Sequence, residues 1–133
     1  MDTAGTSTDP SGGRPVSRAD APVFFDSDAV AWQAHPLFPP IDIKDLQPGA
    51  AHPAGTFSLM RVKVAAGGRI DPHTHPVETE TAYVLRGAAR LLCQGVTTEL
   101  RAGGGVSIPP GLEHSLEADA EVELLAIHTP PLR

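Results

Sequence analysis

Lysine, cysteine and aromatic residues are scarce in this chain of 133 residues, and each shortage excludes a class of protein. Lysine and arginine together number 10 against 16 acidic residues, which gives a net charge of −6. An acidic chain without clustered basic residues lacks the contacts that nucleic-acid phosphates require. The single cysteine, Cys93, has no partner for an internal disulfide, as is typical of a reducing compartment. We therefore expect no nucleic-acid partner and a cytoplasmic protein.

Long apolar runs are also missing from the chain. No stretch approaches the roughly 20 residues that a membrane span needs. The first residues carry neither the basic nor the apolar segment of a secretory signal, so we expect no membrane partner. Residues 1–20 are rich in Thr, Ser, Gly, Asp and Pro and are predicted to form a disordered tail. Residues 21–133 are predicted to form a single domain, long enough to bury one core.

Turn-forming residues, by contrast, are abundant, with 13 glycines and 14 prolines. The short apolar runs between them show no helical period, apart from a weak helical alternative at 26–33. This pattern indicates an all-β fold, either an antiparallel sandwich or a barrel. The predicted strands are Ile41–Leu46, Thr56–Ala65, Glu80–Arg86, Ala88–Gln94, Val96–Arg101, Gly105–Ile108, His114–Glu117 and Glu121–Thr129.

Three histidines and one glutamate stand at spacings that suit a single metal ion. His73 and His75 are two residues apart, so in a strand both side chains would point to the same face. Glu80 follows after a short turn, and His114 follows the tight turn at 109–111. Imidazole and carboxylate groups are side-chain ligands of divalent transition metals. Each residue alone would more simply be structural, but four buried polar groups without a common partner would be unfavourable.

These residues fall within two blocks that resemble the signature motifs of the cupin superfamily. The first motif, G(X)5HXH(X)3–4E(X)6G, is matched by Gly67, His73, His75, Glu80 and Gly87. The second, G(X)5PXG(X)2H(X)3N, is matched by Gly103, Pro109, Gly111 and His114. Ala118 stands where this motif has its asparagine. That asparagine is not a metal ligand, so only a turn contact is in doubt.

The resemblance implies the cupin double-stranded β-helix, a jelly-roll barrel of two antiparallel sheets. It also implies one divalent transition metal (Mn, Fe, Ni, Cu or Zn) bound by His73, His75, Glu80 and His114, and commonly a homodimer. Similar cupins include dioxygenases, isomerases, lyases and decarboxylases, so neither the fold nor the ligands choose a reaction. We expect a mononuclear metalloenzyme that acts on a small polar molecule. The alternative is a cupin that binds or senses a small molecule without catalysis.

The sequence leaves several other side chains open. Glu78 is predicted to be solvated rather than a ligand, and Glu113 to point away from the pocket. His128 is either a pocket residue or a histidine at a strand end, because both faces of its strand are apolar. Arg61 is predicted to lie on the outer surface, with a clamp for a substrate carboxylate as the alternative. Cys93 is predicted to be a small buried hydrophobe.

Predictions for the loops and the N-terminal aromatic residues complete the sequence analysis. His35 and His52 lie in proline-containing loops and are expected to be exposed. Trp32 and the pair Phe24 and Phe25 precede the barrel and are expected to pack on a partner subunit rather than on their own barrel. Tyr83 is out of phase with Glu80, so it should lie on the outer sheet face or in a dimer contact.

Overall fold

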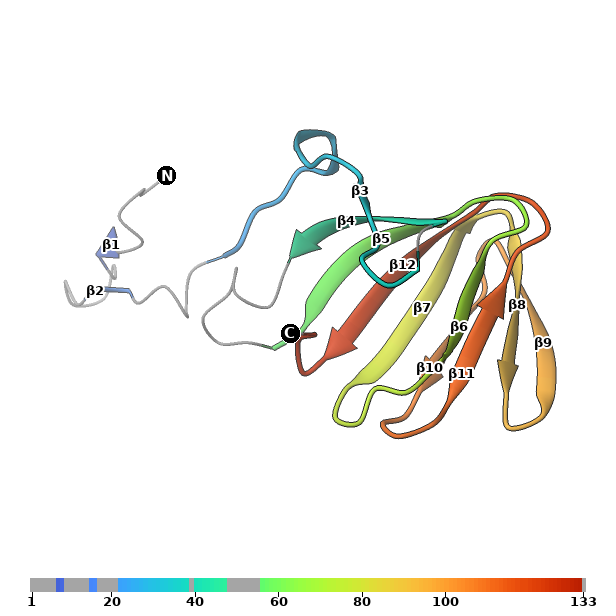
Figure 1. The fold of residues 1–133 in the computed structure, drawn as a ribbon. Coiled ribbons are helices and arrows are strands. Elements are labelled where there is room, and N and C mark those ends of the chain that lie inside the picture. The colour runs from blue at the N-terminus through green and yellow to red at the C-terminus, as the bar shows by residue number, and fades with distance from the viewer. Residues whose placement is uncertain (1–6, 9–14, 17–21, 39, 48–55, 133) are drawn as a thin grey trace.

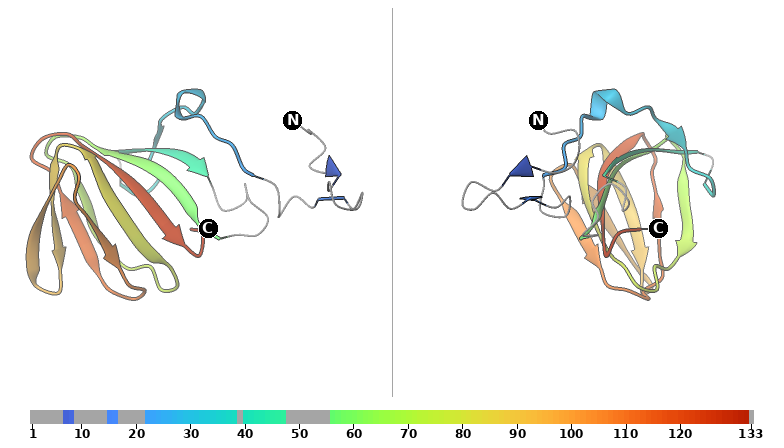
Figure 2. Two further views of the ribbon diagram at one scale, coloured as in Figure 1. Left: turned by 180° about the vertical axis from the view of Figure 1, so that it is seen from behind. Right: turned by 90° about the vertical axis from the view of Figure 1, so that its left-hand side faces the viewer.

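Two antiparallel β-sheets form the body of the protein (Figures 1 and 2), seen here in a computed structural model. The structure describes residues 7–8, 15–16, 22–38, 40–47 and 56–132. Within these ranges, no helix has the length and apolar character that a membrane span requires. The predicted tail at 1–20 lies mostly outside the described residues, as does His52. Two short strands within that tail, β1 (Ser7–Thr8) and β2 (Pro15–Val16), pair with each other.

The larger sheet has six strands in the order β10-β7-β12-β5-β4-β3, and the smaller has four in the order β6-β11-β8-β9. All neighbouring strands in both sheets are antiparallel. The larger sheet consists of β3 (Gln33–Ala34), β4 (Ile41–Gln47), β5 (Ser58–Val64), β7 (Thr79–Arg86), β10 (Gly105–Ile108) and β12 (Val122–Thr129). The smaller sheet consists of β6 (Arg69–His73), β8 (Ala88–Cys93), β9 (Val96–Arg101) and β11 (His114–Glu117).

The observed strands confirm the all-β prediction, and their ends differ from the expected ones by at most two residues. The structure adds β1, β2, β3 and β6 to the predicted set. The helical alternative at 26–33 is wrong, since only a short 3-10 turn forms there, η2 (Ser27–Ala29). Asp26 caps this turn by accepting a hydrogen bond from the backbone N–H of Asp28 at 3.0 Å.

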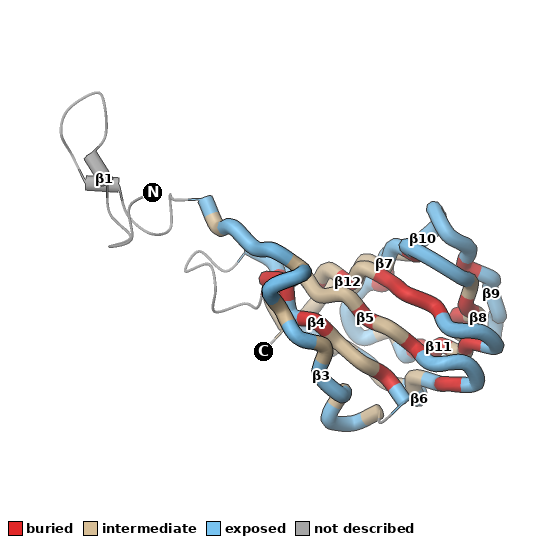
Figure 3. The backbone as a smooth tube through the Cα atoms, turned by 90° about the horizontal axis from the view of Figure 1, so that it is seen from above, coloured by how far each residue is buried: buried red, intermediate tan, exposed pale blue. Residues whose placement is uncertain are grey.

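Apolar side chains from both sheets fill the space between them. In β5, the buried residues Val62 and Val64 alternate with the half-buried Arg61 and Lys63, as a period of two requires. Figure 3 shows buried positions recurring along strands of both sheets. The largest fully buried side chains all belong to the six-stranded sheet: Ile41, Val64, Val84 and Val122.

Tight turns connect the strands, and Gly87 shows why one of them requires glycine. Gly87 joins β7 to β8 with a φ of 83°, in the left-handed region that glycine favours. A Cβ atom added there would lie 2.6 Å from the backbone oxygen of Glu121. The turn between β8 and β9 uses Gln94 and Gly95, both with positive φ, as a two-residue hairpin demands.

The N-terminal segment packs on the protein's own sheet, contrary to the expectation for Trp32. The centre of its indole ring lies 4.3 Å from Lys63 Nζ and 5.1 Å from Lys44 Nζ. The Arg61 guanidinium carbon lies 5.2 Å from the same ring centre. These cation–π contacts hold Trp32 on its own chain. In the described structure Phe24 is 72% exposed and Tyr83 is 46% exposed, so both side chains are accessible to a partner.

Candidate metal centre

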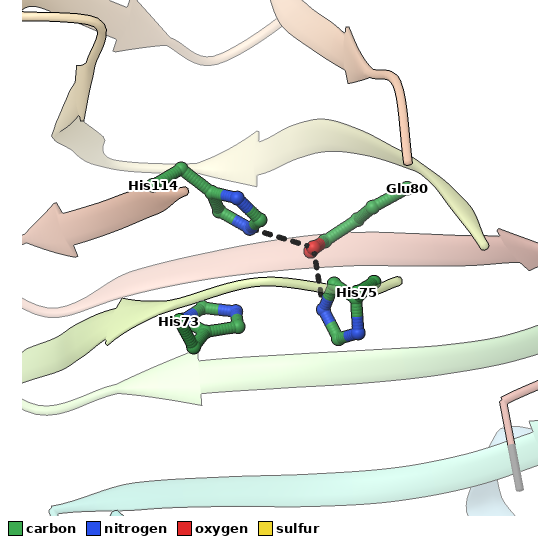
Figure 4. Close-up of side chains that lie close together, drawn as sticks. All are labelled: His73, His75, Glu80 and His114. Carbon is green, nitrogen blue, oxygen red and sulfur yellow. Dashed lines mark hydrogen bonds and ion pairs between the residues drawn. The ribbon is translucent and has the colours of Figure 1, made fainter. Parts of the chain in front are cut away.

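The four predicted donors come from both sheets and meet at one end of the barrel interior (Figure 4). His73 is the last residue of β6, and His114 is the first residue of β11, directly opposite it. Glu80 is the second residue of β7 in the other sheet. His75 lies just beyond β6, so the expectation that one strand carries both His73 and His75 is wrong. The turn after β6 nevertheless brings His75 to the same site.

The donor atoms are close enough to share one ion. One ligand atom from each of His73, His75, Glu80 and His114 lies within 4.8 Å of the other three. Glu80 Oε1 is 3.1 Å from His75 Nε2 and 3.0 Å from His114 Nε2. Ligands about 2.1 Å from one metal ion are separated by about 3.0–3.4 Å when the angle between them is 90° to tetrahedral. These two spacings therefore match neighbouring ligands of a single ion.

Backbone carbonyl groups orient two of the imidazole rings. The Nδ1–H group of His73 donates to the carbonyl oxygen of Asp71 at 2.8 Å, and that of His114 donates to the carbonyl oxygen of Leu112 at 2.9 Å. Since the proton stays on Nδ1, a neutral ring turns the lone pair of Nε2 toward the site. Such hydrogen bonds fix the tautomer and the orientation of metal-binding histidines.

The donor chemistry also fits a cation. Nε2 of neutral His114 and the carboxylate oxygen of Glu80 are both acceptors, yet they lie 3.0 Å apart. Two acceptors at this distance need a positive charge between them, either a proton or a metal ion. Three imidazoles and one carboxylate form a set that divalent transition metals accept. The residues present therefore fit the metal that the motifs imply.

The pKa values of the cluster respond to burial and to the neighbouring groups. Burial raises the pKa of Glu80, but the hydrogen bond from His114, the close approach of His75 and the nearby His128 imidazole outweigh it and hold the pKa far below its usual range. Burial lowers the pKa of His114, but hydrogen bonds to Glu80 and to the Leu112 carbonyl raise it above 6.5. The pKa of His73 is lowered, mainly by burial. Glu80 is therefore an anion, and His114 holds a second proton more tightly than a free imidazole does.

His128 lies beside this cluster, so it is on the inner face of β12, a question that the sequence had left open. It stands opposite Glu80 in the pairing of β12 with β7. Its Nε2 atom is 3.8 Å from Glu80 Oε1, and its ring centre is 5.0 Å from that of His75. Val122, Leu124 and Ala126 are buried on the same inner face as His128, whereas the sequence had left this orientation undecided. Because Leu125 and Ile127 on the opposite face are also apolar, the sequence pattern alone could not identify the inner face.

A cavity of about 590 Å³ opens beside the donors. His73, His75, Glu80 and His128 form part of its wall. Most of the remaining wall is apolar: Leu37, Phe38, Ile41, Ile43, Met60, Val62, Ile70, Ala126 and Leu132. A cavity of this size with few polar groups is typical of a small-molecule site.

His35 also lines the cavity, so the prediction that it is exposed is wrong. Its Nδ1 atom accepts a hydrogen bond from the backbone N–H of Leu37 at 3.0 Å, and its ring packs against Phe38 at 4.9 Å between centres. The proline-rich loop thus folds over the barrel rather than away from it. This tertiary contact has no local sequence signal.

The remaining candidate residues lie outside the cluster. Glu78 is half-buried and Glu113 is exposed, and neither belongs to the group of donors. Arg61 forms an ion pair with Glu123 and does not line the cavity, so the alternative of a substrate clamp finds no support. Cys93 is half-buried and packs against the core, as expected of a small apolar residue.

A family model described as "Cupin domain" matches residues 60–128, which is more than half of the chain. The protein therefore belongs to the cupin family, and its two antiparallel sheets are the cupin fold. The matched region includes all four predicted donors, so motif, fold and family agree.

Two sequence relatives and one solved structure add detail. Protein SchB from Streptomyces halstedii is 37% identical over 79 residues, which are 58% of this chain and 57% of SchB. Polyketide synthase CurC from Streptomyces cyaneus is 28% identical over 106 residues, 69% of each chain. The polyketide cyclase RemF from Streptomyces resistomycificus superposes with a TM-score of 0.69 at 25% identity, covering 83% of this chain and 82% of RemF. The chain thus spans little more than half the length of SchB.

Proposed function

We propose that this protein is a mononuclear metal-dependent cupin enzyme that closes rings in a polyketone chain. The observation that carries the proposal is the position of three of the four donors, His73, His75 and Glu80, in the wall of a largely apolar cavity. His73, His75, Glu80 and His114 would hold the ion. When bound, the ion supplies Lewis acidity to carbonyl and enol oxygens of the substrate. The similarity to proteins named polyketide synthase and polyketide cyclase supports this substrate class.

The cavity suits such a substrate in two ways. Its apolar walls, among them Phe38, Ile43 and Met60, can bury the carbon chain and exclude water from it. Four polar side chains of the wall, His73, His75, Glu80 and His128, lie together, and oxygen atoms of the substrate would collect there. This arrangement departs from the small polar substrate expected from the sequence.

Ring closure needs no oxidant. A carbon next to a carbonyl group loses a proton and attacks another carbonyl carbon of the same chain. A carbon–carbon bond forms, and the attacked carbonyl oxygen gains a proton. Loss of water then gives an unsaturated or aromatic ring. The proton lost and the proton gained balance, so only acid–base and Lewis-acid assistance are required.

Dioxygenase activity is the second candidate, and a separate cavity favours it. His73, Glu80 and His114 form part of the wall of this cavity of about 50 Å³. The rest of its lining is apolar: Ile70, Ala82, Leu91, Leu100, Val106, Ile108 and Leu116. A space of this size would admit a diatomic gas such as O₂ next to the donors.

Metal binding is tested first, by elemental analysis of protein purified without a histidine tag or chelator. We expect about one transition-metal ion per chain, and a His73→Ala variant that folds but loses most of it. Thr74→Ala is the matched control, because Thr74 lines the same cavity without belonging to the cluster. Unchanged metal content in His73→Ala would contradict the proposal.

The reaction is tested with diacetylacetone, a short linear triketone. Ring closure with loss of water converts it to orcinol, which mass spectrometry and ultraviolet absorption detect. We expect faster orcinol formation with metal-loaded protein than with the His73→Ala variant, and no consumption of O₂. Consumption of O₂ with the triketone would favour the dioxygenase. Saturable binding without any turnover would favour the non-catalytic binding protein instead.

A further inference from the structure

His128 is buried at the candidate metal centre, and no residue that the structure describes forms a hydrogen bond with its ring. It is 3% exposed, and neither of its ring nitrogens is satisfied by the part of the chain that the structure describes. Burying a polar group without a partner is unfavourable, so such groups are rare in folded proteins. A hydrogen-bond partner that is available only when the site holds a metal ion would explain why a histidine is tolerated at position 128.

Glu80 has the complementary need when an ion is bound. In the structure its Oε1 atom is within 3.1 Å of Nε2 of both His75 and His114. As metal ligands, these two imidazoles turn Nε2 lone pairs toward the ion and no longer donate hydrogen bonds to the carboxylate. A ligating carboxylate is normally held in place by a hydrogen bond from a neighbouring residue. Glu80 therefore requires a new donor at the moment when it binds the ion.

His128 is placed to be that donor. It pairs with Glu80 across β12 and β7, so the backbone fixes the two side chains next to each other. Its Nε2 atom lies 3.8 Å from Glu80 Oε1, and a shift of about 1 Å would bring it to hydrogen-bond distance. Both ring nitrogens are enclosed and make no competing hydrogen bond within the described structure.

We propose that His128 is a positioning residue of the metal centre, donating an imidazole N–H hydrogen bond to Glu80 and orienting its carboxylate toward the ion. This inference rests on the proposed metal binding by His73, His75, Glu80 and His114. It adds a fifth residue, from the last strand, that does not itself ligate the ion. The last strand then has a defined role in metal affinity.

The test uses the full chain with His128→Leu and His128→Gln, each prepared free of metal and titrated with Zn(II). Leucine removes the donor, and we expect the Kd for zinc to rise about 10–100-fold. The glutamine amide keeps an N–H donor, so its Kd should stay close to that of the wild type. His35→Asn is the matched control, since His35 lines the same cavity and asparagine can still accept from Leu37. Its Kd should not change.

Two further measurements separate positioning from other roles. Pulsed EPR of the Cu(II)-loaded protein counts the coordinated imidazoles, and we expect the same number in the wild type and in His128→Leu. The thermal midpoint of metal-free His128→Leu should be equal to or higher than that of the wild type, because an unpartnered buried polar group has been removed. Lower affinity together with unimpaired metal-free stability is a combination that a merely structural residue would not produce.

Each contrary result has a distinct meaning. Loss of one coordinated imidazole in His128→Leu would make His128 a ligand and overturn the positioning role. An unchanged zinc Kd in His128→Leu would show that the residue has no part in the centre. A parallel fall in metal-free stability and affinity in both variants would make it structural. If the wild type itself binds no metal ion, the proposed function fails and this inference fails with it.

Discussion

The affinity for metal should depend on pH through His114. In the metal-free protein at a pH below its pKa, this ring carries a proton on both nitrogens, with Nδ1–H donating to the Leu112 carbonyl at 2.9 Å and Nε2–H to Glu80 at 3.0 Å. Burial lowers the pKa of His114, but these two bonds raise it above 6.5. An ion needs the lone pair of Nε2, so binding must release one proton from this ring below that pKa.

The size of the effect follows from the proton count. One proton released per ion changes the apparent Kd about tenfold per pH unit, or about 1.4 kcal/mol. Glu80 is already ionised, because its pKa is held far below its usual range. The pKa of His73 is lowered by burial, so this ring is already neutral near pH 6.5. Between pH 6.5 and 5.5 we therefore expect the proton on His114 to raise the Kd for zinc by up to about tenfold.

Competition with a chromophoric chelator of known pH dependence measures this Kd directly. Circular dichroism at each pH checks that the protein stays folded. The variant Glu80→Gln removes a hydrogen bond that raises the pKa of His114, so its proton release should move to lower pH while its affinity falls. A Kd for wild-type protein that does not change between pH 6.5 and 5.5 would refute the reasoning.

Three predictions concern the scaffold. Gly105→Ala should lower the free energy of unfolding by about 1–3 kcal/mol, because its Cβ would lie 2.2 Å from the backbone oxygen of Ala82. Glu123→Ala should lower it by about 1–3 kcal/mol, since Glu123 is 5% exposed and pairs with Arg61 and Arg86. Zinc at 100 times its Kd should raise it by about 2.7 kcal/mol, because only the folded protein assembles the site.

Urea denaturation of the metal-free protein measures the first two effects, and the same titration with and without zinc measures the third. Ala102→Ser is a suitable surface control, because Ala102 is exposed and should tolerate a hydroxyl group. Wild-type stability in Gly105→Ala or Glu123→Ala would show that the backbone or the ion pair can relax at little cost. An equal midpoint with and without zinc would contradict specific binding to the folded state.

Much of this fold and site could be predicted because the signals are local. Turn glycines such as Gly87 and Gly95 mark strand ends wherever the backbone needs a positive φ. The alternation around Val62 and Val64 gives the inner face of β5 without knowledge of its partners. The four candidate donors could be identified because the spacing within the two cupin motifs reflects which side chains the barrel brings together.

What escaped prediction depends on contacts between distant segments. Trp32 finds its cationic neighbours on β4 and β5, and His35 reaches the cavity through the loop that precedes β4. Neither contact leaves a periodic signal. His128 was left undecided for a different reason, because Leu125 and Ile127 are half-buried on the outer face of β12. With apolar residues on both faces, hydrophobicity alone cannot show which way the strand faces.

The origin of the donors explains why the site and the fold depend on each other. His73 and His114 belong to or adjoin the four-stranded sheet, whereas Glu80 and His128 stand on adjacent strands of the six-stranded sheet. Their polar groups meet only when the two sheets pack over the apolar core. Without a cation, this packing brings an anionic carboxylate, acceptor nitrogens and an unpartnered imidazole together in a partly dry space, which is unfavourable. The apolar core must offset that unfavourable free energy, which a bound ion would remove. We therefore expect metal affinity and the stability of the sandwich to change together in variants that loosen the contact between the sheets.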